Sequence, residues 1–164
     1  MALAVTHIIL TIITLDFFRH YVFKKDKFPR YLLVIGGIAG LLPDIDIPFS
    51  WIYNFFTNSQ ASFHGLYTHS LFFPIIFLTI GGILHYKKNL IWAKIFYVIS
   101  AGFFAHLLLD CAFGGYKSFI WPLTSIGSSC PKWDSSPYAS GIDAIILVAW
   151  LIHEELHKKI RDYF

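Results

Sequence analysis

Residues 90–110 read LIWAKIFYVISAGFFAHLLLD, an almost unbroken apolar run that ends with a histidine and an aspartate four residues apart. Its apolar part, Leu90–Leu109, has the ~20 residues that a helix needs to cross a bilayer. Ionisable side chains in or beside such a span are costly, and by default they mark a functional site. The stretch therefore predicts a membrane-spanning helix with part of a polar site, His106 and Asp110, at one end.

The composition extends this interpretation to the whole chain. Of the 164 residues, 56% are hydrophobic and only 14% are charged, whereas a soluble domain usually carries about 25% charged residues. The polar surface is too small to cover a water-facing globule, so membrane lipid is the expected surroundings and partner. The length predicts one domain, residues 1–164. A net charge of +3 gives no reason to expect nucleic acid.

Five apolar segments separated by polar connections predict an all-α, polytopic helix bundle with about five transmembrane segments. The second and fifth segments are short, and tilting, re-entrance or local membrane thinning would each accommodate them. The segments run Ala2–Phe18, Tyr31–Leu42, Leu66–Leu84, Leu90–Leu109 and Ser140–Ile152.

The basic residues predict the orientation. Eleven of the thirteen Lys and Arg residues lie in residues 19–30, 87–94 and 158–161, which fall on one side if the chain crosses five times. Because cytoplasmic loops are enriched in Lys and Arg, we expect a multi-pass plasma-membrane protein with its N-terminus outside and its C-terminus inside. The first segment has no basic residues before it, so it is expected to be an anchor and not a cleaved signal peptide.

This topology gathers histidines and aspartates from all five segments at the extracytoplasmic face. Imidazole nitrogen and carboxylate oxygen are ligands of Zn²⁺ and related metals. Asp143 is a weaker candidate, because an acidic residue at a helix start is also stabilised by the helix dipole. The other candidate ligands are His7, Asp44, Asp46, His64, His69, His106 and Asp110.

Four carboxylates could offset the charge of two divalent ions, and we expect two Zn²⁺. Metal ions with open coordination positions activate water and polarise phosphoryl or carbonyl oxygens, and Asp46 or Asp110 could serve as the general base. Simpler roles stay open: Asp44 and Asp46 could belong to a turn that ends a helix, and His106 could bind a backbone carbonyl. A metal-binding membrane protein without catalysis, with a sensor, carrier or structural site, is the main alternative.

The motif His153-Glu154-Glu155-Leu156-His157 offers a minor alternative. It matches the H-E-x-x-H pattern of zinc proteases, in which both histidines bind zinc and the glutamate is the general base. Here the motif lies near the end of the chain, on the side expected to be cytoplasmic. The alternating charges of this segment favour an ordinary solvated helix end.

Cys111 and Cys130 are the only cysteines, and both fall in the connection expected outside the cell. Disulfides persist outside the reducing cytosol, so we expect the two to pair and to brace the neighbouring Asp110. Two free thiols, or Cys111 as a metal ligand, are the alternatives.

Taken together, the motifs resemble the YdjM-like family, described as LexA-regulated, membrane-bound metal-dependent hydrolases. The shared motifs are His7, Leu42-Pro43-Asp44-Ile45-Asp46, His64 to Ser70, His106 to Asp110 and Trp121-Pro122. The resemblance implies an all-α metal hydrolase loosely similar to zinc-dependent phospholipase C, and hence a lipid phosphoester as substrate. Two positions depart from the family pattern: Gly65 replaces an arginine and Ile47 a histidine. If that arginine binds an anionic substrate, Lys117 or Lys132 is expected to replace it.

Overall fold

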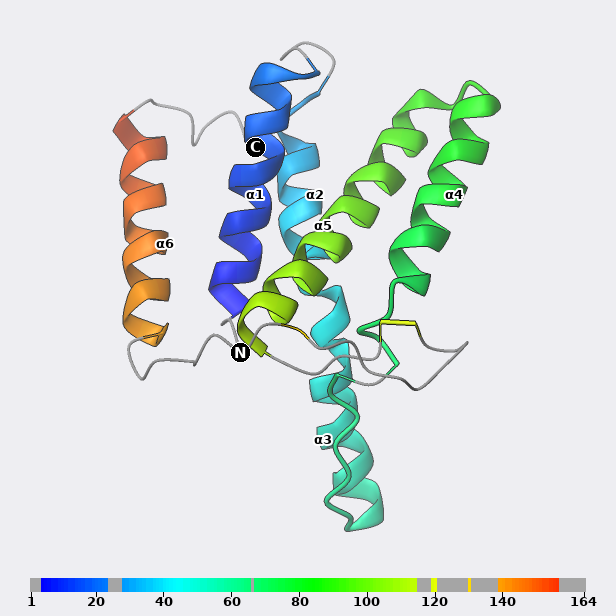
Figure 1. The fold of residues 1–164 in the computed structure, drawn as a ribbon, viewed down its shortest axis with the longest axis vertical. Helices are drawn as coiled ribbons and strands as arrows, with labels where there is room; N and C mark the ends of the chain where they lie inside the picture. The colour runs from blue at the N-terminus through cyan, green and yellow to red at the C-terminus, as the bar shows by residue number, and fades with distance from the viewer. Residues whose placement is uncertain are drawn as a thin grey trace.

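The chain is described by a computed structural model over residues 4–23, 28–65, 67–114, 119–120, 130 and 139–156. Within these ranges it contains six α-helices, one short 3₁₀ helix and no strand, which confirms the all-α expectation. Helices α1, α2, α4, α5 and α6 stand side by side, and α3 projects beyond one end of them (Figure 1). The elements are α1 Ala4–Tyr21, α2 Tyr31–Ala39, η2 Leu42–Ile45, α3 Asp46–Thr57, α4 Phe72–Tyr86, α5 Leu90–Gly114 and α6 Ala139–Leu156.

The buried apolar core lies where α1, α2 and α5 meet. It includes Ile12 and Leu15 from α1, Leu32 and Leu33 from α2, and Val98 from α5. Between helices in lipid, close van der Waals packing is what drives association. The core therefore holds α5 against the two N-terminal helices, and α4 packs along the other flank of α5.

Glycine allows α2 and α5 to cross in direct backbone contact. A Cβ atom at Gly102 of α5 would collide with the carbonyl oxygen of Gly36 and lie 3.0 Å from the Cβ of Ala39. Small residues at helix crossings permit this approach. As a result, the end of α2 at Gly40 lies against the part of α5 that carries His106.

The chain bends after α2 and then reverses at the tip of α3. Helices α2 and η2–α3 meet at 48°, with Pro43 in the first turn of η2. Asn58 ends α3 in the left-handed conformation, φ 49°. The Asn54 side chain holds the segment that returns along α3. It donates a hydrogen bond to the backbone oxygen of Ala61 at 2.9 Å and accepts one from the backbone nitrogen of Ala61 at 3.0 Å. This return brings His64, Gly65, Thr68 and His69 back to Asp46 at the base of α3.

The expectation of about five transmembrane segments is not supported. Among the described residues, one helix, Leu90–Ala112 within α5, is long and apolar enough to span a membrane, or two if the bent pair of α2 and η2–α3 is one broken span. Helix α4 has 15 residues, which at about 1.5 Å per residue falls short of the ~30 Å hydrocarbon core. The second predicted segment is interrupted because α2 ends at Ala39.

The structure joins Cys111 to Cys130, with the sulfur atoms 2.09 Å apart, as the sequence predicted. Neither cysteine is a free thiol. The pairing ties the segment that contains Cys130 to the C-terminal end of α5, next to Asp110.

Candidate metal centre

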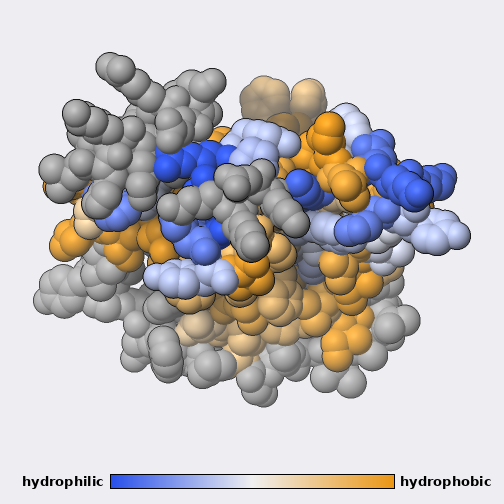
Figure 2. Space-filling model, turned by 90° about the horizontal axis from the view of Figure 1, so that it is seen from above, coloured by the Kyte–Doolittle hydropathy of each residue, from blue (hydrophilic) through white to orange (hydrophobic). Residues whose placement is uncertain are grey.

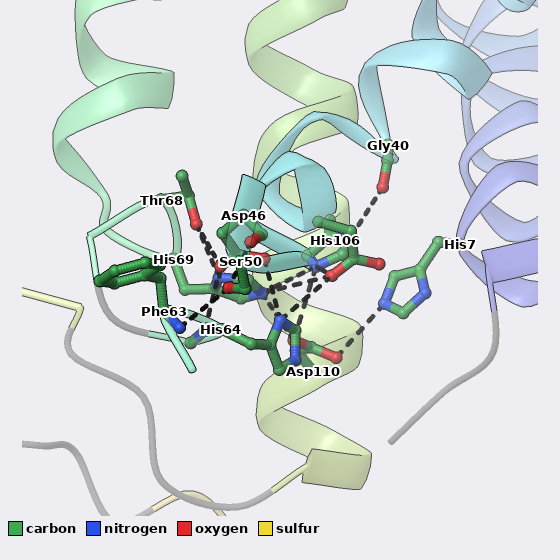
Figure 3. Close-up of polar contacts among 12 residues, drawn as sticks. His7, Gly40, Asp46, Ser50, Phe63, His64, Thr68, His69, His106 and Asp110 are labelled. Carbon is green, nitrogen blue, oxygen red and sulfur yellow. Dashed lines mark hydrogen bonds and ion pairs between the residues drawn. The ribbon is translucent and has the colours of Figure 1, made fainter. Parts of the chain in front are cut away.

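All seven predicted His and Asp ligands meet at one end of the helix bundle, at the base of α3 (Figure 3). Five of the seven are buried, and Asp44 and His64 are half-buried. His7 comes from α1, Asp44 from η2, Asp46 from the start of α3, His64 and His69 from the connection between α3 and α4, and His106 and Asp110 from α5.

Four donor atoms form the centre of this cluster. His69 Nε2 lies 3.3 Å from His106 Nε2, and both nitrogens lie 3.6 Å from Oδ1 of Asp44. Oδ2 of Asp110 lies 3.2 Å from His69 Nε2 and 3.5 Å from His106 Nε2. Zinc bonds of about 2.0–2.2 Å place tetrahedral donors about 3.3 to 3.6 Å apart. The five separations therefore fit five of the six edges of a tetrahedron around one zinc-sized cation.

The hydrogen bonds of the two imidazoles explain why a cation suits this space. His106 Nδ1 lies 2.7 Å from the carbonyl oxygen of Gly40, which can only accept, so Nδ1 carries the proton. His69 Nδ1 faces the Asp46 carboxylate at 3.3 Å, which orients its proton in the same way. In the neutral rings, both Nε2 atoms then present lone pairs to each other and to carboxylate oxygens. A metal ion converts this set of acceptors into ligands.

His7 and His64 flank the central donors on either side. His7 Nε2 lies 3.5 Å from Oδ1 of Asp110, and the His7 ring stacks on the ring of His106 at 4.0 Å. His64 Nδ1 lies 3.8 Å from Oδ1 of Asp44. His64 Nε2 is buried and has no hydrogen-bond partner in the part of the chain that the structure describes. Two groups that could each hold a metal ion follow: His7, His106 and Asp110, and Asp44, His64 and His69.

Asp46 is buried in the same cluster, but its oxygens accept from the surrounding loop. Oδ2 accepts from Thr68 Oγ1 at 2.7 Å and from the backbone nitrogen of Gly65 at 3.1 Å. Oδ1 lies 3.1 Å from His64 Nδ1. Carboxylates that hold the second nitrogen of a metal-binding histidine fix its tautomer and orientation. Asp46 therefore has the contacts of a residue that orients His64 and His69.

The surroundings lower the pKa of two carboxylates, Asp44 in η2 and Asp46 at the start of α3. Burial raises the pKa of Asp46, but hydrogen bonds from His64 and His69 outweigh burial and hold this pKa well below its usual range. Burial likewise raises the pKa of Asp44. The hydrogen bond with His69 and the charges of neighbouring histidines outweigh burial and lower this pKa overall. Both groups lie outside α5, which is the one unbroken helix long enough to span among the described residues. Ionised carboxylate is the form that binds metal.

Local sequence explains how the loop reaches Asp46. Gly65 has a φ of 80°, a conformation that glycine adopts without the steric cost that a side chain adds. This turn points the nitrogen of Gly65 at Asp46. Ser50 adds a second link between the loop and α3. Its hydroxyl donates to the backbone oxygen of Asp46 at 2.7 Å and accepts from the backbone nitrogen of Phe63 at 3.1 Å. The glycine that departs from the family pattern thus has a structural role here.

Most of the other sequence candidates lie wholly or partly outside the described residues. Asp143 lies in α6, with its side chain outside the described part, and Lys117 and Lys132 lie outside the described residues altogether. His153 is exposed on α6, while the Glu154 side chain and His157 also lie outside the description. Sequence reasoning missed the orienting groups. Thr68 lies within the quoted His64–Ser70 motif and could have been noticed, whereas the Gly40 carbonyl gives no sequence signal.

The fold and the cluster together define a helical membrane protein with a His/Asp site suited to a metal ion. The chain belongs to the YdjM inner membrane protein family, whose sequence pattern matches residues 1–161. Membership is consistent with the expected lipid surroundings and with the plasma membrane. No curated protein and no solved structure matches the chain.

Proposed function

We propose that the chain is a membrane-embedded, metal-dependent hydrolase that uses two zinc ions to cleave a lipid phosphoester. The observation that carries this proposal is the pair of adjacent donor groups, His7/His106/Asp110 and Asp44/His64/His69. Catalytic zinc sites commonly have three protein ligands and an open position, whereas structural sites have four. Each group supplies three donors, so two bound ions would both keep a position for water or substrate.

The side chains would divide the work. His7, Asp44, His64, His69, His106 and Asp110 would be the ligands. Zinc bound there would activate water and polarise the phosphoryl group of the substrate. Asp110 is suited to join the two groups, because one oxygen faces His7 and the other faces His69 and His106. Asp46 would act as a positioning residue through His64 and His69, and not as the general base.

The charge of the cluster favours two ions for an anionic substrate. When ionised, the carboxylates of Asp44, Asp46 and Asp110 carry three negative charges, and their contacts include His7, His64 and His106. One divalent ion would leave the site negative, whereas two would make it positive. A phosphate ester would then meet a favourable field. Lys117 and Lys132 remain proposed additional contacts to the phosphate.

A hollow beside His64 offers room for a substrate. It has a volume of about 290 Å³ and is lined by His64, Ile47, Trp51, Asn54 and Gln60, among others. Ligand pockets commonly combine apolar walls with a few polar groups. These side chains suit the junction between the acyl chains and the polar head of a lipid.

The proposed topology places this site at the extracytoplasmic face of a multi-pass protein. Labelling of single cysteines with a probe that cannot cross the membrane tests it. Asn58→Cys, at the tip of α3, should react from outside, and Lys87→Cys, between α4 and α5, should not. Reaction at position 87 alone would place the site in the cytoplasm.

The function is tested with purified full-length protein in detergent. Metal analysis should find two zinc ions per chain, and phospholipid vesicles should yield diacylglycerol. His64→Ala should lose one ion and nearly all hydrolysis, while the exposed His153→Ala should lose neither. Two bound ions without hydrolysis of any phospholipid would refute the substrate assignment.

A second candidate is a metal-binding protein without catalysis. The observation that favours it is the near-tetrahedral set Asp44, His69, His106 and Asp110, which could close around one ion. In that case one ion per chain should bind, and the double variant His7→Ala/His64→Ala should retain it. The metal stoichiometry of the wild type and of this variant therefore separates the two functions.

A further inference from the structure

A second cavity lies at the opposite end of α5 from the metal centre. Its volume is about 470 Å³, and α1, residues Phe23 and Phe28, and the N-terminal part of α5 line it. The walls are mainly apolar, with Leu15, Phe18 and Val98 among them. This volume lies within the range of small-molecule and cofactor sites, about 300–1,000 Å³. The cavity thus has the size and the walls of a binding site for an apolar group.

The polar residues of this cavity are basic or neutral. They are His85, Lys94 and Tyr97, and none of the described lining residues is acidic. Tyr97 Oη lies 3.4 Å from His85 Nδ1. Lys87 and Lys88 follow in the connection from α4 to α5. Figure 2 views the molecule from this end, where hydrophilic residues gather beside hydrophobic ones.

We propose that this cavity binds one anionic phospholipid, with an acyl chain in the cavity and the phosphate beside Lys94. The apolar walls exclude a free phosphate ion as the main occupant, because burying it there would cost its hydration. A lysine can lay its methylene stem along apolar walls while its ammonium group stays at the polar boundary. Basic pockets between transmembrane helices bind anionic lipid heads on the cytoplasmic side. The inference rests on the topology proposed above, which puts the connection of α4 and α5 on that side.

This site is independent of the proposed hydrolase. It lies near Leu90, whereas His106 and Asp110 lie near the other end of the same helix. None of the seven candidate metal ligands lines the cavity. A lipid bound there would be a resident ligand between α1 and α5 and not the molecule that is hydrolysed.

Native mass spectrometry of the full-length protein in detergent tests the proposal. The probes are dioleoyl phosphatidylglycerol, which is anionic, and dioleoyl phosphatidylcholine, which is zwitterionic, added at equal concentrations. Wild type should retain phosphatidylglycerol about five-fold better, as expected for one lysine near an anionic lipid. Lys94→Gln should abolish this preference. Lys88→Gln, which removes the same charge outside the cavity lining, should keep it.

A second variant tests the cavity itself. Ala101→Trp places a large ring at a lining position and should reduce retention of both lipids. An unfolding transition in detergent equal to that of wild type shows that each variant is folded. Equal retention of the two lipids by wild type, or an unchanged preference in Lys94→Gln, would overturn the proposal. So would unchanged lipid retention in Ala101→Trp.

Discussion

The two ends of helix α5 differ in how they use an equally apolar stretch of sequence. At the C-terminal end, His106 and Asp110 are fully buried among other histidines and aspartates. At the N-terminal end, Lys94 borders a cavity with apolar walls. The C-terminal end gathers buried nitrogen and oxygen atoms that can donate electron pairs, whereas the N-terminal end contains a cavity with apolar walls.

This difference teaches what each end requires. Buried charged groups must be paired or coordinate a metal, because an isolated charge in a medium of low polarity is very costly. We therefore expect a cation to bind at the C-terminal end. The N-terminal end has one half-buried lysine at the margin of the cavity, where the proposed lipid would place its phosphate. The following predictions test that division, beginning with the largest expected effect.

The double variant His106→Ala/Asp110→Ala should lose nearly all bound metal. It removes two of the four central donors, including the carboxylate that is suited to join the two groups, and leaves the remaining carboxylates repelling one another. Elemental analysis of purified protein measures the effect. Lys94→Gln, at the other end of α5, is the control and should bind metal like wild type. Unchanged metal content in the double variant would refute the proposed centre.

Asp46→Asn should weaken metal binding by about 10- to 100-fold without abolishing it, the usual effect of removing a partner that orients a metal ligand. The amide keeps the size of the side chain but replaces an acceptor of the loop hydrogen bonds with a donor. Competition with a chelator of known affinity measures the loss. A loss as complete as in the double variant would instead make Asp46 a ligand, and an unchanged affinity would remove it from the site.

Gly102→Ala should destabilise the protein by about 1–3 kcal/mol, the usual cost of overpacking. The added methyl group meets the backbone oxygen of Gly36, so α2 and α5 must separate and Gly40 moves away from His106. Gly82→Ala is the matched control, because the new methyl group has no described atom within 4 Å. Denaturation in detergent compares the two variants. Equal stabilities would contradict the tight crossing.

The smallest effect is expected from the zinc-protease motif. His153→Ala/His157→Ala should change neither metal content nor hydrolysis, since the exposed His153 side chain is outside both donor groups. Loss of metal or activity in a folded double variant would revive the protease alternative.

Much of the candidate site could be predicted from the sequence. Each of the seven residues lies in or beside an apolar segment, and helices of alternating direction bring alternate ends to the same face. The pairing of Cys111 with Cys130 followed from the same reasoning. The number of membrane spans could not be predicted in this way. The apolar content of residues 31–42 gives no sign that α2 ends at Ala39 and that α3 continues at 48° to it.

The sequence by itself determined the class of protein: an all-helical membrane chain whose few buried ionisable residues are of metal-binding types, since composition and the spacing of polar residues are local properties. The tertiary structure alone decided how those residues divide their roles. Asp44 and Asp46 are two residues apart and chemically identical, yet Asp44 faces His69 Nε2 and His106 Nε2 while Asp46 accepts from Gly65 and Thr68. Which contacts each carboxylate makes depends on the return of the chain along α3 and on the close crossing of α2 and α5. Both are contacts between residues distant in sequence.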